Sequence, residues 1–400
     1  MKTFTVKSLL LLSAVFCLQT TTGQTFIQAY ADVVNQCSQT NVTTNLTQYE
    51  ALGVKQRGSA ALQNTLDWLK NKYLSYGYTA AQIVEDPYTY NYAGSPVTCK
   101  NLVVTKIGTV YPNTYVIVCG HYDSITGTGT NDNGSGVITI LEVARLLQNV
   151  PTEYSIKFIN FSGEEDGLRG SQHYVTNVVN ATTPKMDIRL VFNIDEVGGR
   201  AGMTNNSITC ERDTGTPTIN NAASNTMTQE LMNCVSLYSP LTPVLSYAYA
   251  SDYMPFEENT EIITGFFETN ETPYAHTAND LLVNMDPVYN FKVAKAATGA
   301  TLHFAKASVA ALSQGDFDAD FQVSFFPNPS KGKLNINLGT LTDTNYNFSI
   351  IDINGKTVFN KAFINAKQLE AIEVSDLSSG IYMGILESGE KRITKKIVIE

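Results

Sequence analysis

The sequence predicts an α/β domain with a mostly parallel central sheet flanked by helices, followed by a small all-β sandwich domain. Three observations support this prediction. Up to about residue 315, apolar runs alternate with helical patterns, which is typical of a largely parallel sheet. Beyond that point the chain changes to short alternating strands separated by turn residues. The length of 400 residues also exceeds the ~100 to 200 residues of a typical domain.

Five nearly continuous apolar runs are the predicted strands of the central sheet. Strands that are covered on both faces lack the apolar and polar alternation of half-exposed strands, so they appear as continuous apolar runs. The predicted strands are residues 102–106, 115–120, 154–161, 189–196 and 262–268.

Helices are predicted where apolar residues recur every three or four positions. Residues 62–73 have this spacing and are followed by Gly77, a residue that commonly ends helices. Residues 137–147 show the same spacing, and the Ala-rich segment 291–312 is predicted to be the last helix of the first domain.

The N-terminus has the layout of a signal peptide. Lys2 and Lys7 precede an apolar stretch at residues 9–18, and small polar residues follow it. We expect residues 1–23 to be the signal peptide, residues 24–315 the first domain and residues 320–400 the second. No later apolar run approaches the ~20 residues of a membrane span, so we expect an exported protein without a stable transmembrane segment.

The charge of the chain bears on its partners. Asp and Glu number 37 against 27 Lys and Arg, which gives a net charge of -10. An acidic chain has no general attraction to phosphate backbones, so we expect no nucleic-acid partner.

Cysteines in an exported chain can form disulfides. Outside the predicted signal peptide there are five cysteines, so one must stay unpaired within the chain. We expect Cys37 to pair with Cys99 and Cys210 with Cys234, and Cys119 to be a buried thiol in an apolar run. Sequence spacing does not fix the connectivity, so other pairings stay open.

Histidine and carboxylate residues follow the predicted strands where these end. The chain has only four histidines, and His173 and His303 are predicted to be packing residues of helices. The residues at or soon after strand ends are His121, Asp132, Glu164, Glu165 and Asp195. Because parallel strands end at one edge of the sheet, these side chains should meet there.

Carboxylates that gather at one sheet edge repel one another, and a metal cation would relieve this repulsion. Mixed His and carboxylate ligands suit zinc. Apart from the two packing histidines, His121 and His276 remain. If one carboxylate bridges two metal ions, these two histidines and three carboxylates are enough ligands for both ions. One carboxylate of the Glu164 and Glu165 pair would remain to act as a general base.

Six ordered motifs resemble a known family of enzymes. They are GHYDS, NDNGSG, GEEDGLRGSQHY, NIDEVG, SDYMPF and YAHTANDLL, between about residues 100 and 285. They resemble the co-catalytic di-zinc exopeptidases of the bacterial leucyl aminopeptidase and Streptomyces aminopeptidase type. The resemblance implies a zinc exopeptidase-like fold and two zinc ions per chain. It also implies the role of each residue: His121 and Asp195 would hold one zinc, Glu165 and His276 the other, Asp132 would bridge them, and Glu164 would be the catalytic base.

The resemblance further implies features around these ligands. The Asp132–Asn133 peptide bond would be cis, and Asp123 would orient the ring of His121. Asp280 is a candidate to support His276 in the same way. Glu196 and Ala275 depart from the family pattern, which leaves the preferred substrate side chain open.

The C-terminal segment resembles a second family. The stretches FFPNPSKGKLNI, IIDINGKTVF and LSSGIYMGILESGEKRITKKIVIE, within about residues 322–400, resemble a type IX secretion sorting domain. This implies a small β-sandwich that the secretion machinery recognises, and a protein that is secreted or attached to the cell surface. The alternative is a carbohydrate-binding β domain.

Together these features predict a secreted zinc metallopeptidase, an aminopeptidase that removes N-terminal residues from peptides. A serine hydrolase is disfavoured because the sequence has no GxSxG motif. Two alternatives stay open: a one-zinc enzyme similar to glutaminyl cyclase, and a non-catalytic exported peptide-binding protein. Glu258 and Glu261 are predicted to lie in an exposed charged loop.

Overall fold

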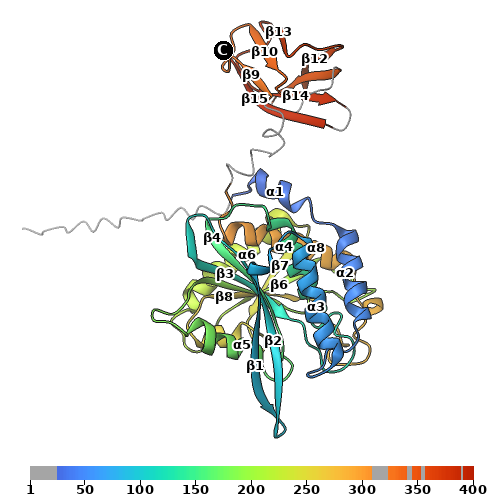
Figure 1. Cartoon of the computed structure of the whole chain (residues 1–400), viewed down its shortest axis with the longest axis vertical. Helices are drawn as coiled ribbons and strands as arrows, with labels where there is room; N and C mark the ends of the chain where they lie inside the picture. The colour runs from blue at the N-terminus through green and yellow to red at the C-terminus, as the bar shows by residue number, and fades with distance from the viewer. Residues whose placement is uncertain (1–24, 309–322, 340–344, 353–355, 389–390) are drawn as a thin grey trace, which may run out of the picture. The chain divides into compact units, whose positions relative to one another are not determined.

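The computed structural model describes residues 25–308, 323–339, 345–352, 356–388 and 391–400 (Figure 1). The chain divides into two compact units, one ending at Ser308 and the other reaching from Val309 to Glu400. The predicted signal peptide and the predicted boundary at residues 315–320 lie outside the described residues. Among the described helices, none is long and apolar enough to span a membrane.

An eight-stranded mixed sheet forms the centre of the first unit. Its strand order is β1-β2-β4-β3-β5-β8-β6-β7. Four of the neighbouring pairs are parallel (β4/β3, β3/β5, β5/β8 and β6/β7) and three are antiparallel (β1/β2, β2/β4 and β8/β6). The strands are β1 (Ile83–Tyr92), β2 (Ser95–Lys106), β3 (Tyr111–His121), β4 (Tyr154–Phe161), β5 (Asp187–Ile194), β6 (Ser207–Arg212), β7 (Thr242–Tyr247) and β8 (Ile263–Glu268).

The five predicted strands correspond to β2, β3, β4, β5 and β8, and β1, β6 and β7 were not predicted. Strands β1 and β7 are the two edges of the sheet, and most of their residues are only partly buried or exposed. They therefore lack the continuous apolar run on which the prediction depended. Figure 1 shows that the β1–β2 hairpin extends well beyond the rest of the sheet.

Helices cover both faces of this sheet. On one face α4 packs against α2, α3 and α8, and α6 packs against α8. On the other face α5 and α7 contribute Tyr174 and Phe256 to a core with Ile117 and Cys119 of β3. The helices are α1 (Gln28–Val34), α2 (Gln39–Ala51), α3 (Ala60–Ser75), α4 (Gly134–Leu147), α5 (Arg169–Tyr174), α6 (Asn221–Tyr238), α7 (Met254–Glu258) and α8 (Pro287–Phe304).

Helix α8 differs from its predicted range of residues 291–312. It begins earlier, because the side chain of Asp286 accepts the backbone N–H groups of the first turn. It ends at Phe304, and Lys306 then has a positive φ of 49°. Ala307 pairs with Thr152 beside the sheet, so the chain has already left the helix there. Residues 309–312 of the prediction lie outside the described residues.

The predicted disulfides are absent. Cys37, Cys99 and Cys210 are free thiols, so neither Cys37–Cys99 nor Cys210–Cys234 forms. Cys37 contacts Thr298 of α8, whereas Cys99 is buried within β2 in another part of the unit. Cys119 is a buried thiol as predicted.

The C-terminal unit is built from two antiparallel sheets. Their strand orders are β13-β10-β9 and β12-β11-β14-β15. Side chains of both sheets, among them Leu334 and Phe348, share one apolar core, as expected for a small sandwich. The strands are β9 (Ser324–Phe326), β10 (Lys333–Asn337), β11 (Tyr346–Ile351), β12 (Thr357–Phe363), β13 (Leu369–Glu373), β14 (Gly380–Ser388) and β15 (Lys391–Ile399).

Candidate metal centre

Three neighbouring parallel strands bring the predicted ligands together. His121 is the last residue of β3, and Asp195 directly follows β5. Glu164 and Glu165 lie in the loop after β4. Because β4, β3 and β5 are parallel neighbours, these loops leave the sheet at the same edge.

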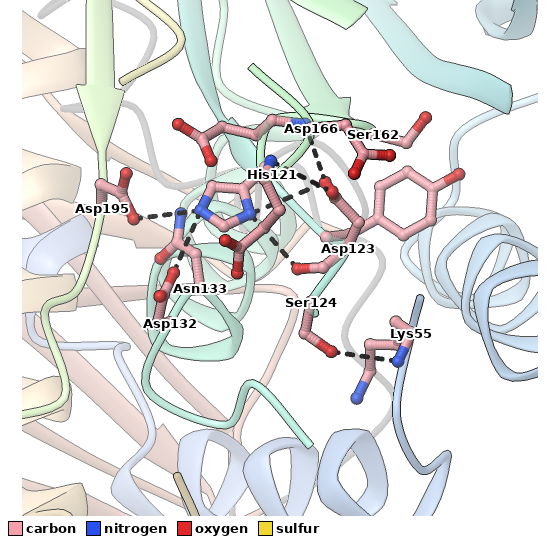
Figure 2. Close-up of polar contacts among 12 residues, drawn as sticks. Lys55, His121, Asp123, Ser124, Asp132, Asn133, Ser162, Asp166 and Asp195 are labelled. Carbon is pink, nitrogen blue, oxygen red and sulfur yellow. Dashed lines mark hydrogen bonds and ion pairs between the residues drawn. The ribbon is translucent and has the colours of Figure 1, made fainter. Parts of the chain in front are cut away.

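The first group of candidate ligands surrounds the ring of His121. Its Nε2 atom lies 3.3 Å from Asp132 Oδ1 and 3.4 Å from Asp195 Oδ1 (Figure 2). Asp195 Oδ1 is buried and has no hydrogen-bond partner in the described part of the chain. Its other oxygen accepts a hydrogen bond of 2.6 Å from Ser251 Oγ. Its contact with the imidazole nitrogen of His121 is therefore the interaction that remains for Asp195 Oδ1.

The second group surrounds His276. Its Nε2 atom lies 3.1 Å from Asp132 Oδ2 and 2.9 Å from Glu165 Oε2. The side chain of His276 is 58% exposed, in contrast to the buried His121. Asp132 thus presents one carboxylate oxygen to each group, which is the position expected of a bridging ligand.

The two groups fit the donor set of zinc. Within each of them, the candidate ligand atoms all lie within 4.8 Å of one another. Each group contains one imidazole nitrogen and two carboxylates, which are preferred zinc ligands. Three protein ligands leave a fourth position for water or substrate, as in catalytic zinc sites.

Loop contacts hold Asp132 between the two groups. The Asp132–Asn133 peptide bond is cis, as predicted. The carboxylate of Asp280 accepts the backbone N–H groups of Asn131 at 2.8 Å and of Asp132 at 3.1 Å. Asp280 thus supports the loop that carries Asp132.

The start of helix α4 also depends on a close approach to β5. A Cβ atom added at Gly136 would lie 2.2 Å from the backbone oxygen of Ile194. Asn133 caps the helix by accepting the N–H of Gly136, and the same oxygen accepts the N–H of Glu196. These contacts fix the loop of Asp132 against the end of β5.

Asp123 connects His121 with the Glu164 and Glu165 pair. The Nδ1 atom of His121 lies 3.7 Å from Asp123 Oδ1 and 3.3 Å from the backbone oxygen of Asp123. The two carboxylate oxygens of Asp123 accept the N–H groups of Glu164 and Glu165, both at 3.3 Å. This carboxylate therefore fixes the loop after β4 relative to the imidazole ring.

The electrostatics of the centre favour binding of a cation. Burial raises the pKa of Glu164 well above its usual value and that of Glu165 to about 8. Burial and the charge of Asp132 raise the pKa of Glu196 to about 11. For His121, burial lowers the pKa, but Asp195 and Glu164 outweigh it and the net pKa is raised well above normal. A bound dication would reverse these shifts for the carboxylates.

A cavity of about 500 Å³ adjoins both ligand groups. Besides the predicted ligands and Glu164, it is lined by residues outside the predicted set of catalytic and metal-binding residues. Ser251, which holds Asp195, is one of them, although its SDYMPF motif was part of the family pattern. The other cavity residues include Glu196, Glu211, Tyr249, Tyr253, Phe267 and Glu271.

The remaining histidines lie elsewhere. His173 stacks on Tyr88, with ring centroids 5.0 Å apart, and contacts Asp86. His303 Nε2 lies 2.8 Å from the hydroxyl of Tyr238. Neither histidine lines the cavity of the candidate centre.

Most of the first unit matches the model of a known protein family. Residues 101–300 match the model of peptidase family M28. This chain belongs to peptidase family M28. A second match identifies residues 324–400 as a secretion system C-terminal sorting domain, which indicates an exported protein.

Individual M28 relatives match over parts of their length. The chain is 45% identical to aminopeptidase YwaD of Bacillus subtilis over 84 residues, which cover 21% of this chain and 18% of the relative. It is 27% identical to a probable zinc metalloprotease of Pyrenophora teres over 278 residues, which cover 63% of this chain and 56% of the relative. The chain thus spans less than two thirds of the length of these curated relatives.

Solved structures share the fold of the M28 unit. An aminopeptidase from Aneurinibacillus aligns with a TM-score of 0.60 at 15% identity, covering 70% of this chain and 97% of that one. A glutaminyl cyclase from Macrostomum lignano aligns with a TM-score of 0.61 at 14% identity, covering 70% and 93%. At these identities the likeness concerns the fold alone, so it does not distinguish the two activities.

Proposed function

We propose that this protein is a secreted zinc aminopeptidase with two zinc ions per chain. The position of Asp132 carries the proposal: its two carboxylate oxygens face two separate His and carboxylate groups beside one cavity. Membership of a peptidase family and the names of the relatives support peptide hydrolysis.

In this proposal each zinc has its own ligands. His121 and Asp195 would hold one ion, Glu165 and His276 would hold the other, and Asp132 would be shared between them. Bound zinc would supply Lewis-acid polarisation of the scissile carbonyl and would lower the pKa of the attacking water.

Glu164 is the proposed general base. It lines the cavity beside the ligands, and its backbone N–H is held by Asp123. Its carboxylate takes the proton of the attacking water and later gives it to the leaving amine.

The acidic surroundings favour a substrate with a free N-terminus. Glu196 and Glu271 line the same cavity as Glu164, and no Lys or Arg is among its lining residues. A peptide's α-ammonium group would be attracted to this surface, whereas an acetylated N-terminus would not. This is why we propose an aminopeptidase.

A set of aminoacyl nitroanilides and their N-acetylated versions would test this function. We expect hydrolysis of the free amines only, loss of activity with a chelator, and recovery with zinc. Metal analysis of the purified chain should give two zinc ions. Equal turnover of N-acetylated substrates would contradict an aminopeptidase.

A one-zinc glutaminyl cyclase is the second candidate, because the fold is equally close to such an enzyme. One zinc per chain and cyclisation of a peptide with N-terminal Gln, without release of that residue, would favour it. Peptide binding without turnover, equal in the wild type and in a Glu164→Gln variant, would instead favour a non-catalytic peptide-binding protein.

The C-terminal unit gives a further partner. We propose that the type IX secretion machinery recognises residues 324–400 during export. Deletion of this unit should leave the protein inside the cell envelope, and normal secretion of the truncated chain would contradict the proposal.

A further inference from the structure

A second group of buried oxygen atoms lies where β6, α6 and α7 meet, away from the predicted zinc ligands. Asp213 directly follows β6, Asn220 and Asn221 lie at the start of α6, and Glu257 belongs to α7. The exposed fractions of Asp213, Asn220 and Glu257 are only 2%, 4% and 1%. Two carboxylates are therefore buried together with amide groups.

One oxygen atom of each of these side chains has no hydrogen-bond partner. Among the described residues, Asp213 Oδ2, Glu257 Oε1, Asn220 Oδ1 and Asn221 Oδ1 are buried without a hydrogen bond. Their donors are already used, since Asn220 Nδ2 donates to Glu261 O at 2.7 Å and Asn221 Nδ2 donates to Gly215 O at 3.2 Å. Buried polar atoms without partners are costly and call for an explanation.

No positive side chain compensates the two carboxylates. In the part of the chain that the structure describes, neither Asp213 nor Glu257 forms an ion pair with Lys, Arg or His. Burial, the charge of Asp213 and a side-chain hydrogen bond with Asp213 raise the pKa of Glu257 to about 7. A cation between the carboxylates would remove this repulsion.

Gly215 lies directly against both carboxylates. A Cβ atom added there would lie 2.4 Å from Glu257 Oε1 and 3.5 Å from Asp213 Oδ1. The N–H of Gly215 donates to Asp213 Oδ1 at 2.8 Å, which fixes one carboxylate relative to this loop. Asn220 Nδ2 lies 3.4 Å from the backbone oxygen of Glu257, so the amide is beside α7 as well.

We propose that Asp213, Glu257, Asn220 and Asn221 form a Ca²⁺ site. All the unsatisfied atoms are oxygens of carboxylates or amides, which are calcium ligands, and no nitrogen or sulfur ligand favours zinc here. Backbone oxygens and waters would complete the six to eight ligands of calcium. Calcium sites of extracellular domains typically have dissociation constants of ~10⁻⁴ to 10⁻³ M, which suits an exported chain.

The bound ion would stabilise one wall of the zinc cavity. Helix α7 follows the segment 249–253, which contributes Tyr249, Ser251 and Tyr253 to that wall. Ser251 also holds Asp195 by its hydrogen bond. Fixing α7 to the loop after β6 would therefore restrain the segment that positions a zinc ligand.

Calcium binding to the full chain tests the site without an activity assay. The protein is stripped of metals, reloaded with zinc alone and dialysed against ⁴⁵Ca²⁺, with the melting temperature measured in parallel. We expect one Ca²⁺ per chain and a rise in melting temperature of roughly 5 °C at a hundredfold excess over the dissociation constant. Absence of both effects in the wild type would overturn the proposal, as would an equal effect of Mg²⁺.

Conservative variants identify the ligands. Asp213→Asn and Glu257→Gln should bind Ca²⁺ at least tenfold more weakly, whereas Glu258→Gln, an exposed neighbour on the same helix, should bind as the wild type does. Unchanged Ca²⁺ binding by both ligand variants would assign the ion to another place and overturn the site.

The melting temperatures of the variants test the site independently of the binding measurement. Without calcium, Asp213→Asn should melt at or above the wild-type temperature, because it removes repulsion between two buried carboxylates. With calcium the order should reverse. A variant that melts below the wild type in both buffers would show a carboxylate pair that shares a proton instead, and would overturn the metal site.

Discussion

Removing the carboxylate of Asp280 tests how the loop of Asp132 is held. Asp280 is 2% exposed, and its two oxygens accept the backbone N–H groups of Asn131 and Asp132. In Asp280→Ala both N–H groups lose their partner in a buried place, at about 1 to 3 kcal/mol each, or about 2 to 6 kcal/mol together. The loop should relax to recover part of this cost, and Asp132 would then leave its bridging position.

We therefore expect Asp280→Ala to weaken zinc binding by about 10- to 100-fold. Competition with a chromogenic chelator would measure this affinity, and urea unfolding would measure the free energy of unfolding. Asp280→Asn keeps one acceptor oxygen and should lie between the alanine variant and the wild type.

Asp286→Ala is the matched control. The carboxylate of Asp286 also accepts two backbone N–H groups, those of Val288 and Tyr289, but at the start of α8. Its loss should cost about 0.5 to 2 kcal/mol of stability, typical of a helix cap, and leave zinc affinity unchanged. If Asp280→Ala destabilised the protein but bound zinc as tightly as Asp286→Ala does, the positioning role of Asp280 would be refuted.

Three further predictions follow from single residues. Glu164→Gln should lower kcat by about 10²- to 10⁴-fold and leave the zinc content unchanged. Nitroanilide kinetics and metal analysis would measure the two quantities, and a loss of zinc would argue against a purely catalytic role. Gly136→Ala should destabilise the first unit and weaken zinc binding, because its Cβ would lie 2.2 Å from the backbone oxygen of Ile194. If this variant had the melting temperature and zinc affinity of the wild type, α4 would be able to shift freely. Burial lowers the pKa of His303 to about 4, so the unfolded chain binds this proton more readily and stability should fall as pH drops from 6.5 towards 4. In His303→Gln this decline of the melting temperature should be smaller, and an identical pH profile would contradict the assignment.

Much of the candidate centre could be predicted from the sequence because its geometry follows from local order along the chain. A strand covered on both faces is a continuous apolar run, so the ends of β3, β4 and β5 were recognisable. The ligands follow those ends directly, and parallel neighbours bring them to one edge of the sheet. The order of the motifs then supplied His276, which no periodic pattern marks.

Contacts between distant segments could not be predicted in this way. The edge strands β1 and β7 carry no apolar run, and the predicted partners Cys37 and Cys99 lie on separate elements. Glu258 is exposed as predicted, but it is the last residue of α7 and not part of a loop. Glu261 is buried and pairs with Lys185.

The sequence by itself determined how the buried strands and the ligands follow one another along the chain, whereas the tertiary structure decided which groups lose their water. Glu257 lies beside the exposed Glu258, and nothing in the local pattern separates the two. Only the packing of α7 against the loop after β6 buries Glu257 with Asp213, 44 positions earlier in the chain. The free-energy cost of burying a charge depends on all the segments packed around it, whereas sequence periodicity describes only the segment that carries the charge.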